Sequence, residues 1–251
     1  MKAIDLMKPI KLDEMDKVTL MNRIDLKYWI NSKHLPFLLE SIQEEYYILT
    51  IDGEKLLPYS TTYYDTPNDA MYISHHNGKL NRFKIRHRTY VSSKISFLEI
   101  KFKNNKGRTI KTRISSNSED LNQFKSQDKE FIQNNSPYSV NDLHISLQNN
   151  FQRITLVNKN FAERCTIDLN LQFIDSEKTL ELENIAIIEI KTDGKATNSL
   201  LAKTLRDLRI KQTGFSKYCI GRSYTDTELK QNNFKRKIRS IEKEINSNTN
   251  K

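Results

Sequence analysis

The chain has 251 residues, enough for one large domain or two small ones with a substantial core. Its 41 Lys and Arg against 31 Asp and Glu give a formal net charge of +10, which favours anionic partners such as nucleic acid, a phosphorylated metabolite or an anionic lipid surface. The two cysteines lack metal-site spacing, and neither a membrane span nor the apolar run of a signal peptide is visible, so we expect a cytoplasmic protein without a disulfide scaffold.

The amino-terminal part of the chain predicts a lead-in, a strand and a helix. Residues 1–20 form the lead-in, with apolar residues at helical spacing. The segment NRIDLKYWI, residues 22–30, alternates charged and apolar residues as a strand does. A helix is predicted over residues 32–46, where Ser32 can cap an apolar stripe.

The next segment, STTYYDTPND over residues 60–69, predicts a strand that ends in a turn at Asp65 and Pro67. The neighbouring His75 and His76 invite a metal-site interpretation. In a strand, however, adjacent residues point apart, and no third ligand is in sight, so we expect a surface position for both.

The stretch RFKIRHR carries cations at every second position, with no acid between them: Arg82, Lys84, Arg86 and Arg88. In a strand all four side chains point to one face. Residues two apart lie about 7 Å from each other, so each adjacent pair repels by about 2 kcal/mol at an effective dielectric of about 20. An enclosed site with this row of charge needs a polyanion to offset the repulsion.

The same alternation recurs in later segments, namely residues 94–103, 107–115, 151–158, 163–173 and 185–193. Their charged faces hold few Ser, Thr or Gln, and their acids are single residues among Lys and Arg. Residues 116–150 are polar and predicted to be helical in pieces on the outside of the fold. A helix is predicted over residues 197–209, and a frayed helix followed by a disordered end after residue 229.

Two arrangements fit this pattern of strands. One is an antiparallel sheet with a solvated charged face, and the other is a sheet that closes with its charged faces inward. A solvated sheet mixes charges of both signs more evenly than this one does. A closed sheet would form a cationic channel lined by a few carboxylates, which suits an oligophosphate and a divalent ion.

Seven segments, in this order, carry a resemblance to a known family: RIDLKYWI, STTYYDTPND, RFKIRHRTY, FLEIKFK, KTRI, IIEIK and GFSKY. They resemble the VTC (vacuolar transporter chaperone) domain of polyphosphate polymerases, within the triphosphate tunnel metalloenzyme (CYTH-like) superfamily. The resemblance spans roughly residues 12–224. It implies an α+β fold with an antiparallel β-barrel tunnel of about eight strands and helices packed outside. We expect a lead-in over residues 1–20, the tunnel domain over 21–228 and a Lys/Asn-rich tail over 229–251.

The resemblance also implies site residues. Those that match the catalytic or phosphate-binding positions of the family, or line the same wall, are Lys27, Arg86, Arg88, Lys101, Lys111, Arg113, Arg153, Arg164, Lys191, Ser216 and Lys217. Glu189 matches the glutamate that holds the metal ion, Mn2+ or Mg2+. Glu99 and Asp168 are either further metal ligands or structural partners of neighbouring cations. The hydrolases of the superfamily open with Glu-x-Glu-x-Lys, whereas this chain has Arg23 at the first acidic position.

The function that the resemblance implies is a polyphosphate polymerase that transfers the γ-phosphate of ATP to a growing inorganic polyphosphate chain. Alternatives are a hydrolase of triphosphate or nucleoside triphosphates and a non-catalytic polyphosphate-binding module. No specific nucleic acid is expected, because few aromatic residues share the cationic faces. Membrane partners in the family couple synthesis to translocation, and the sequence does not identify such a partner.

Overall fold

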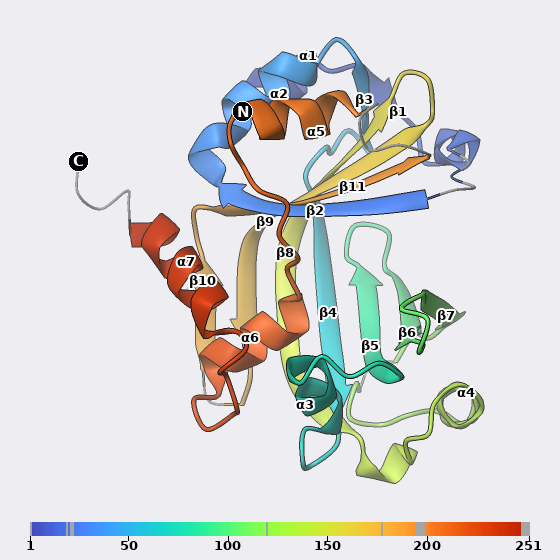
Figure 1. The fold of residues 1–251 in the computed structure, drawn as a ribbon. Coiled ribbons are helices and arrows are strands. Elements are labelled where there is room, and N and C mark those ends of the chain that lie inside the picture. The colour runs from blue at the N-terminus through green and yellow to red at the C-terminus, as the bar shows by residue number, and fades with distance from the viewer. Residues whose placement is uncertain are drawn as a thin grey trace.

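The computed structural model describes residues 2–18, 20, 23–118, 120–176, 178–193 and 199–246. An 11-stranded sheet forms the centre of this part of the chain (Figure 1). Eight of its strands follow one another by antiparallel pairing, in the order β2 (Arg23–Asn31), β11 (Ile185–Asp193), β9 (Glu163–Ile174), β8 (His144–Asn158), β4 (Leu57–Asp65), β5 (Arg82–Tyr90), β6 (Ile95–Lys103) and β7 (Thr109–Ser115). Three short strands extend the sheet: β1 (Pro9–Ile10), β3 (Tyr46–Leu49) and β10 (Thr179–Leu182).

The sheet is strongly curled, and Figure 1 shows β2 crossing above the upright strands β8, β4 and β5. This confirms the expected α+β class and the antiparallel tunnel sheet of eight strands, in the form of a half-barrel. Among the described residues, β2 and β7 at the two ends of the path do not pair with each other. The half-barrel is therefore open along this seam.

Short helices surround the sheet: α1 (Lys2–Leu6), α2 (Leu35–Ile42), α3 (Ala70–His76), α4 (Ser126–Asn135), α5 (Leu200–Asp207), α6 (Lys217–Thr225) and α7 (Lys235–Asn246). There are also 3-10 turns at Asp13–Lys17, Ser32–His34 and Val140–Asp142. Helices α1, α2 and α5 lie together on one side of the sheet, and α3, α6 and α7 lie below β2 in Figure 1.

The strand parity decides which side chains form the core. On the outer face, residues such as Ile154, Ile167 and Ile188 are fully buried beneath α2 and α5. The opposite, concave face is apolar where α6 covers it, with Leu147 and Phe173 buried, and is charged farther along the strands. The predicted assignment of faces, with cations inside and apolar residues beneath the helices, agrees with this arrangement.

Several local expectations need correction. The predicted helix over residues 32–46 begins as a 3-10 turn and continues as α2 only to Ile42, and Asn31 rather than Ser32 provides the cap. The stretch 116–150 contains α4, but β8 already begins at His144. Of the predicted helix over 197–209, the structure describes α5, while residues 197 and 198 lie outside the described residues, as do residues 247–251 of the expected disordered end.

The two histidines are not surface residues of a strand, because both belong to helix α3. His76 is buried and accepts a hydrogen bond from the backbone N–H of Asn233 through Nε2 at 3.1 Å. The imidazole of His75 lines the concave cavity described below. The surface expectation fails because the helical conformation turns this segment onto the body of the protein.

Asp65 is the turn residue that was predicted, and it is also a fully buried anchor. Its carboxylate accepts hydrogen bonds from the backbone N–H groups of Thr66 at 2.8 Å and of Met71 and Tyr72 at 2.9 Å. It also accepts the phenolic hydrogen of Tyr218 in α6. These partners supply the hydrogen bonds that a buried carboxylate needs. Because they come from different elements, Asp65 joins β4, α3 and α6.

Candidate functional site

The concave face of the half-barrel encloses a cavity of about 450 Å³. All eight strands of the antiparallel path, together with α3 and α6, contribute side chains to its wall. The predicted site residues that line it are Lys27, Arg86, Arg88, Lys101, Lys111, Arg153, Lys191, Ser216, Lys217, Glu189 and Asp168. Glu99, Arg113 and Arg164 are not part of this lining.

One ion-pair cluster is centred on Glu99, which is completely buried. The register places Arg86 on β5 opposite Glu99 on β6. Arg86 Nε donates a hydrogen bond to Glu99 Oε2 at 2.7 Å, and Lys111 from β7 contacts Oε1. Burial alone would raise the pKa of Glu99, but the neighbouring Arg86 and Arg88 lower it to about 2. Glu99 is thus ionised and saturated by cations.

A second cluster is centred on Asp168 of β9. Arg153 of β8 binds it with both arms of its guanidinium, at 2.5 Å from Nε to Oδ1 and 2.9 Å from Nη2 to Oδ2. Lys217, the first residue of α6, contacts the same carboxylate. The guanidinium of Arg153 also lies over the ring of Tyr59, at 4.9 Å from its centroid. This cluster holds the start of α6 against the strands.

The third cluster lies at the β2–β11 pair, where the register places Glu189 directly opposite Lys27. Lys27 Nζ lies 3.0 Å from Glu189 Oε1, and Lys191 Nζ lies 4.0 Å from the same oxygen. Burial favours the neutral acid, but Lys191 and Lys27 outweigh it and lower the pKa of Glu189 to about 2. About a quarter (24%) of this side chain remains exposed.

Other cations in the cavity have no carboxylate partner among the described residues. Burial and the adjacent Arg86 and Arg153 lower the pKa of Arg88 to about 10, and its Nε is buried without a hydrogen-bond partner. Arg86 and burial lower the pKa of Lys101 well below its usual value. These two residues lie on adjacent strands, and neither forms an ion pair in the described chain, although Glu99 attracts both and Glu189 also attracts Lys101.

Ser216 adds a polar group at the end of this wall. Its hydroxyl oxygen accepts hydrogen bonds from Lys84 Nζ at 2.9 Å and from the backbone N–H of Cys219 at 3.2 Å, which caps α6. Since both contacts use the oxygen as acceptor, the hydroxyl hydrogen can be donated to a ligand. A serine that presents its hydrogen beside two lysines is suited to bind a phosphate oxygen.

The carboxylates of the three clusters differ in how well they could bind a divalent cation. Side chains of Glu99 and Asp168 are 0% and 4% exposed and each contacts two cations, which favours the structural role for both. Glu189 keeps access to the cavity, and a Mg2+ or Mn2+ ion is commonly held by one or two carboxylates together with substrate phosphates and waters. The described residues contain no group of three or more acidic, histidine or cysteine side chains placed for a metal. Glu189 therefore fits a metal that the substrate helps to bind.

The two predicted cations outside the cavity lining occupy different places. Arg113 lies on β7, with its guanidinium 4.4 Å from the centroid of the Phe97 ring. Arg164 lies on β9 opposite Lys191 of β11 and lowers the pKa of that lysine, although burial is the larger cause. Their predicted role as phosphate ligands stays a prediction.

Sequence patterns did not identify three of the lining groups, namely His75, Tyr63 and Lys103. Tyr63 stacks on Tyr218 with ring centroids 5.1 Å apart, and so supports α6 from the sheet. The alternation of β6 was the available signal for Lys103, which shares a face with Lys101, whereas β4 shows no alternation of charged and apolar residues that would have indicated Tyr63. Nothing in the sequence around His75 indicated that its helix would reach the cavity.

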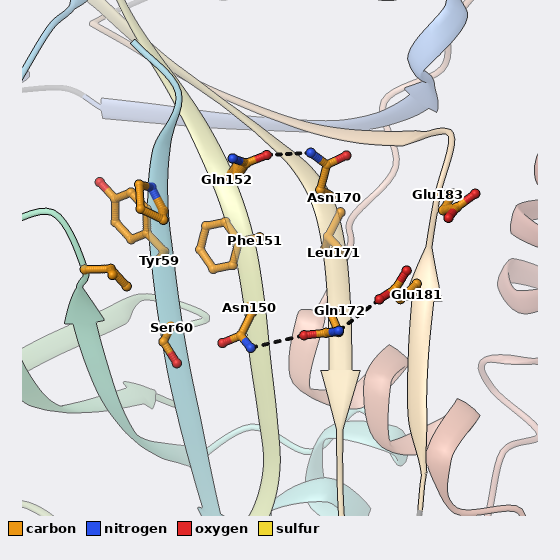
Figure 2. Close-up of a pocket in the computed structure, with 12 residues that line it drawn as sticks. Tyr59, Ser60, Asn150, Phe151, Gln152, Asn170, Leu171, Gln172, Glu181 and Glu183 are labelled. Carbon is orange, nitrogen blue, oxygen red and sulfur yellow. Dashed lines mark hydrogen bonds between the residues drawn. The ribbon is translucent and has the colours of Figure 1, made fainter. Parts of the chain in front are cut away.

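A second hollow, of about 640 Å³, lies along β4, β8, β9 and β10 and has a different character (Figure 2). Side-chain hydrogen bonds connect Asn150 to Gln172 at 3.2 Å and Gln172 to Glu181 at 2.9 Å. Its lining, as far as the structure describes the chain, consists of amides, apolar groups and two glutamates without any Lys or Arg. Of these two hollows, the concave cavity therefore has the charge for a polyanion.

The comparisons with known proteins agree with this architecture. The model of the VTC domain matches residues 22–225, and the chain therefore belongs to the VTC domain family. No curated protein matches the chain significantly. None of the described helices is long and apolar enough to cross a membrane.

Two solved structures show the same fold at low identity. One is a candidate adenylyl cyclase from Hippeastrum, described as having a dominant triphosphatase activity, with a TM-score of 0.53 and 15% identity over 80% of this chain and 96% of that chain. The other is a candidate adenylate cyclase from Bacillus halodurans, with a TM-score of 0.50 and 10% identity over 78% of this chain and 96% of that chain. These similarities show that the chain shares its fold with both proteins.

Proposed function

We propose that this protein is a metal-dependent polyphosphate polymerase, which transfers the γ-phosphoryl group of ATP to the end of an inorganic polyphosphate chain. The observation that carries the proposal is that Arg88 and Lys101 form no ion pair in the described chain and line a cavity that Glu189 shares. In such a transfer, the bond between the γ-phosphorus and its bridging oxygen breaks, a new bond forms to a terminal chain oxygen, and ADP leaves. Positioning and charge stabilisation supply most of the rate.

The residues of the cavity divide this work. Arg88 and Lys101 bind phosphate oxygens on the β5–β6 wall, and Ser216 and Lys217 bind them from the start of α6. Arg86 and Arg153 are fixed by buried carboxylates and therefore act as oriented donors. Glu189, with Lys27 beside it, would hold Mn2+ or Mg2+, whose charge would offset that of the bound phosphates.

The first strand favours transfer to a phosphate chain over hydrolysis. Arg23 occupies the position of the first acid, and its Nε lies 2.7 Å from Asp25 Oδ1. Both groups line the cavity, so the acid that remains on β2 is engaged by a neighbouring cation. Glu189 is then the carboxylate best placed for a metal, and a hydrolase that activates water between two metals requires more ligands than that.

The test is to incubate the purified protein with ATP and either Mn2+ or Mg2+, with and without a short phosphate primer, and to measure chain growth and orthophosphate release separately. We expect ADP and long phosphate chains, and we expect Glu189→Gln to abolish both. Release of orthophosphate without chain growth would identify a triphosphatase. Tight binding of polyphosphate without turnover under any condition would identify a binding module.

A further inference from the structure

One end of the cavity is bordered by the start of β5, the end of β6, α3 and α7. We call the cations there the cationic rim, and they are Arg82, Lys84, Lys103 and Lys237. The first three line the cavity, as does the neighbouring imidazole of His75. Arg82 lies directly opposite Lys103 in the β5–β6 register. Lys237 belongs to α7. Its charge, like the charges of Lys84, Arg82 and Lys103, lowers the pKa of the nearby His75.

The cations of the rim use their hydrogen-bond donors on neutral oxygens. Arg82 donates to the carbonyl of Lys79 at 2.7 Å, and Lys84 donates to the hydroxyl of Ser216. Lys237 donates to the carbonyl of Gly214. The side chain of Lys103 has no hydrogen bond or ion pair within the described part of the chain. In contrast to the inner clusters around Glu99, Asp168 and Glu189, the rim therefore has no ion pair with a carboxylate in the described chain and can attract an anion.

His75 supports this account of the rim. Its ring lies at the end of α3 and meets Phe234 edge-on, with centroids 6.2 Å apart. Burial, followed by the four surrounding cations, lowers the pKa of His75 to about 2, so the imidazole is neutral. The groups that dominate its surroundings are all cationic, which shows how strongly positive this end of the cavity is.

Helix α7 brings Lys237 to the rim by ordinary packing. Ile238 and Ile241 are buried in the core beneath it, and Asn233 donates a side-chain hydrogen bond to the carbonyl of His76 at 2.7 Å. The family model ends at residue 225, so α7 lies beyond the part of the chain that matches the VTC domain. The contribution of α7 to the rim is therefore a feature of this chain rather than of the matched domain.

We propose that the cationic rim is a second anion subsite, which binds the phosphates of an inorganic polyphosphate chain beyond those held by the inner cations. The inference rests on the proposed function, because it assigns one end of the same cavity to the chain. A short ligand such as tripolyphosphate is satisfied by the inner cations. A longer chain leaves the cavity past Lys103 and Lys237 and gains contacts there.

The test compares the binding of tripolyphosphate and of medium-chain inorganic polyphosphate by calorimetry, at several salt concentrations. Lys103→Ala is the main variant, since this side chain makes no hydrogen bond or ion pair in the described chain that the substitution would remove. Its matched control is Lys106→Ala, in the exposed turn of the same hairpin. Lys237→Ala tests the contribution of α7, with Lys235→Ala on the exposed side of that helix as its control.

We expect Lys103→Ala and Lys237→Ala each to weaken binding of the long chain by about three- to tenfold and that of tripolyphosphate by less than about twofold. The dependence of the logarithm of long-chain affinity on the logarithm of salt concentration should become shallower by about one unit for each variant. Both controls should leave the two affinities close to those of the parent protein.

Equal losses for the short and the long ligand, unchanged long-chain affinity, or equal effects of the controls would each overturn the proposal. So would the absence of long-chain binding to the parent protein. These outcomes are independent of turnover. If the protein binds long chains through the rim but synthesises none, the rim proposal stands and the polymerase proposal is refuted. If it synthesises chains but both variants bind them as the parent does, the polymerase proposal stands and the rim proposal is refuted.

Discussion

The cations of the cavity are of two kinds, and the difference is decided by single contacts. Arg86 and Arg153 face buried carboxylates, so their charge belongs to the folded structure. Arg88 has similar burial but forms no ion pair in the described chain, and burial together with repulsion from Arg86 and Arg153 outweighs the attraction of Glu99. Substitution should therefore separate the residues that hold the cavity together from those that bind the ligand.

Arg88→Ala should weaken the binding of tripolyphosphate by about 1–3 kcal/mol, as expected for a charge-assisted contact, while leaving the free energy of unfolding unchanged or raising it. The reason is that the substitution removes a ligand contact and also relieves repulsion from Arg86 and Arg153. Calorimetric titration and urea unfolding measure the two quantities. A large loss of stability would show that Arg88 has an unseen structural partner.

Arg86→Ala, in contrast to Arg88→Ala, should lower the free energy of unfolding. It leaves the completely buried Glu99 with Lys111 as its remaining ion-pair partner, and such a loss costs about 3–5 kcal/mol of unfolding free energy. The urea midpoint should therefore fall well below that of Arg88→Ala. Similar midpoints for the two variants would contradict the assignment of Arg86 to the structural cluster.

The pH dependence of ligand binding should report on Lys191. Burial lowers the pKa of Lys191 to about 8, so it loses its positive charge as the pH rises through that value, and anion affinity should then fall. The terminal phosphates of the ligand also lose protons in this range, so the parent protein and Lys191→Arg are compared with the same ligand, and the difference between their profiles reports on the lysine. Lys191→Arg keeps the charge and should reduce the fall in tripolyphosphate affinity measured between about pH 7 and about pH 10. An identical pH profile in the variant would show that Lys191 does not contribute to binding.

Lys217 should cause part of the decline in both proteins, because burial also lowers the pKa of Lys217 to about 8.

At the scale of single elements, α6 depends on close contact with the sheet. A Cβ on Gly221 would lie 2.5 Å from Leu147 Cδ2 and from Phe173 Cδ1. Gly221→Ala should therefore lower the unfolding free energy by about 1–3 kcal/mol through overpacking, and should also weaken tripolyphosphate binding by displacing Lys217. Gly214→Ala, whose Cβ meets nothing within 4 Å, is the matched control. Equal urea midpoints for the two variants would show that α6 does not rest on the sheet at this point.

The inner face of each strand could be predicted because its alternation is strict, and the residues of β5 and β11 lie where that alternation assigned them. The start of β8 could not be predicted from the sequence, because polar residues such as the fully buried Asn149 interrupt the apolar pattern there. Helix α3 is short and follows Asp69, whose backbone is left-handed (φ 52°), so no apolar stripe announced it. Parity also leaves open how far a sheet closes, which depends on contacts between distant strands.

At the scale of the whole molecule, the segment after residue 229 is more closely integrated than its composition suggested. Its isoleucines gave only weak periodicity, which predicted a frayed helix, whereas Ile238 and Ile241 are 9% and 0% exposed in the core. The polar sequence obscured this packing, because a few apolar residues are enough to dock a helix of this length on an existing cluster. In α7 these residues are Ile238, Ile241 and Ile245. The proposed division of the chain into domains stays a prediction.

Ile241→Ala should therefore lower the unfolding free energy by about 2–5 kcal/mol, because it leaves a cavity where α7 meets the core. Ile110→Ala is the matched control, since that isoleucine is 46% exposed on β7 and should change stability far less. Urea unfolding of both variants measures the difference. Indistinguishable midpoints would mean that α7 contributes little to the stability of the folded protein.

Cations without an ion pair, such as Arg88 and Lys101, also affect the lifetime of the folded protein. Their mutual repulsion opposes folding whenever the cavity holds no anion, so a bound polyanion stabilises the native chain as well as occupying it. Ligand at about 100 times its dissociation constant would add about 2.7 kcal/mol to the unfolding free energy. Resistance to heat and to proteases should thus rise and fall with the phosphate reserve of the surroundings, independently of any catalysis.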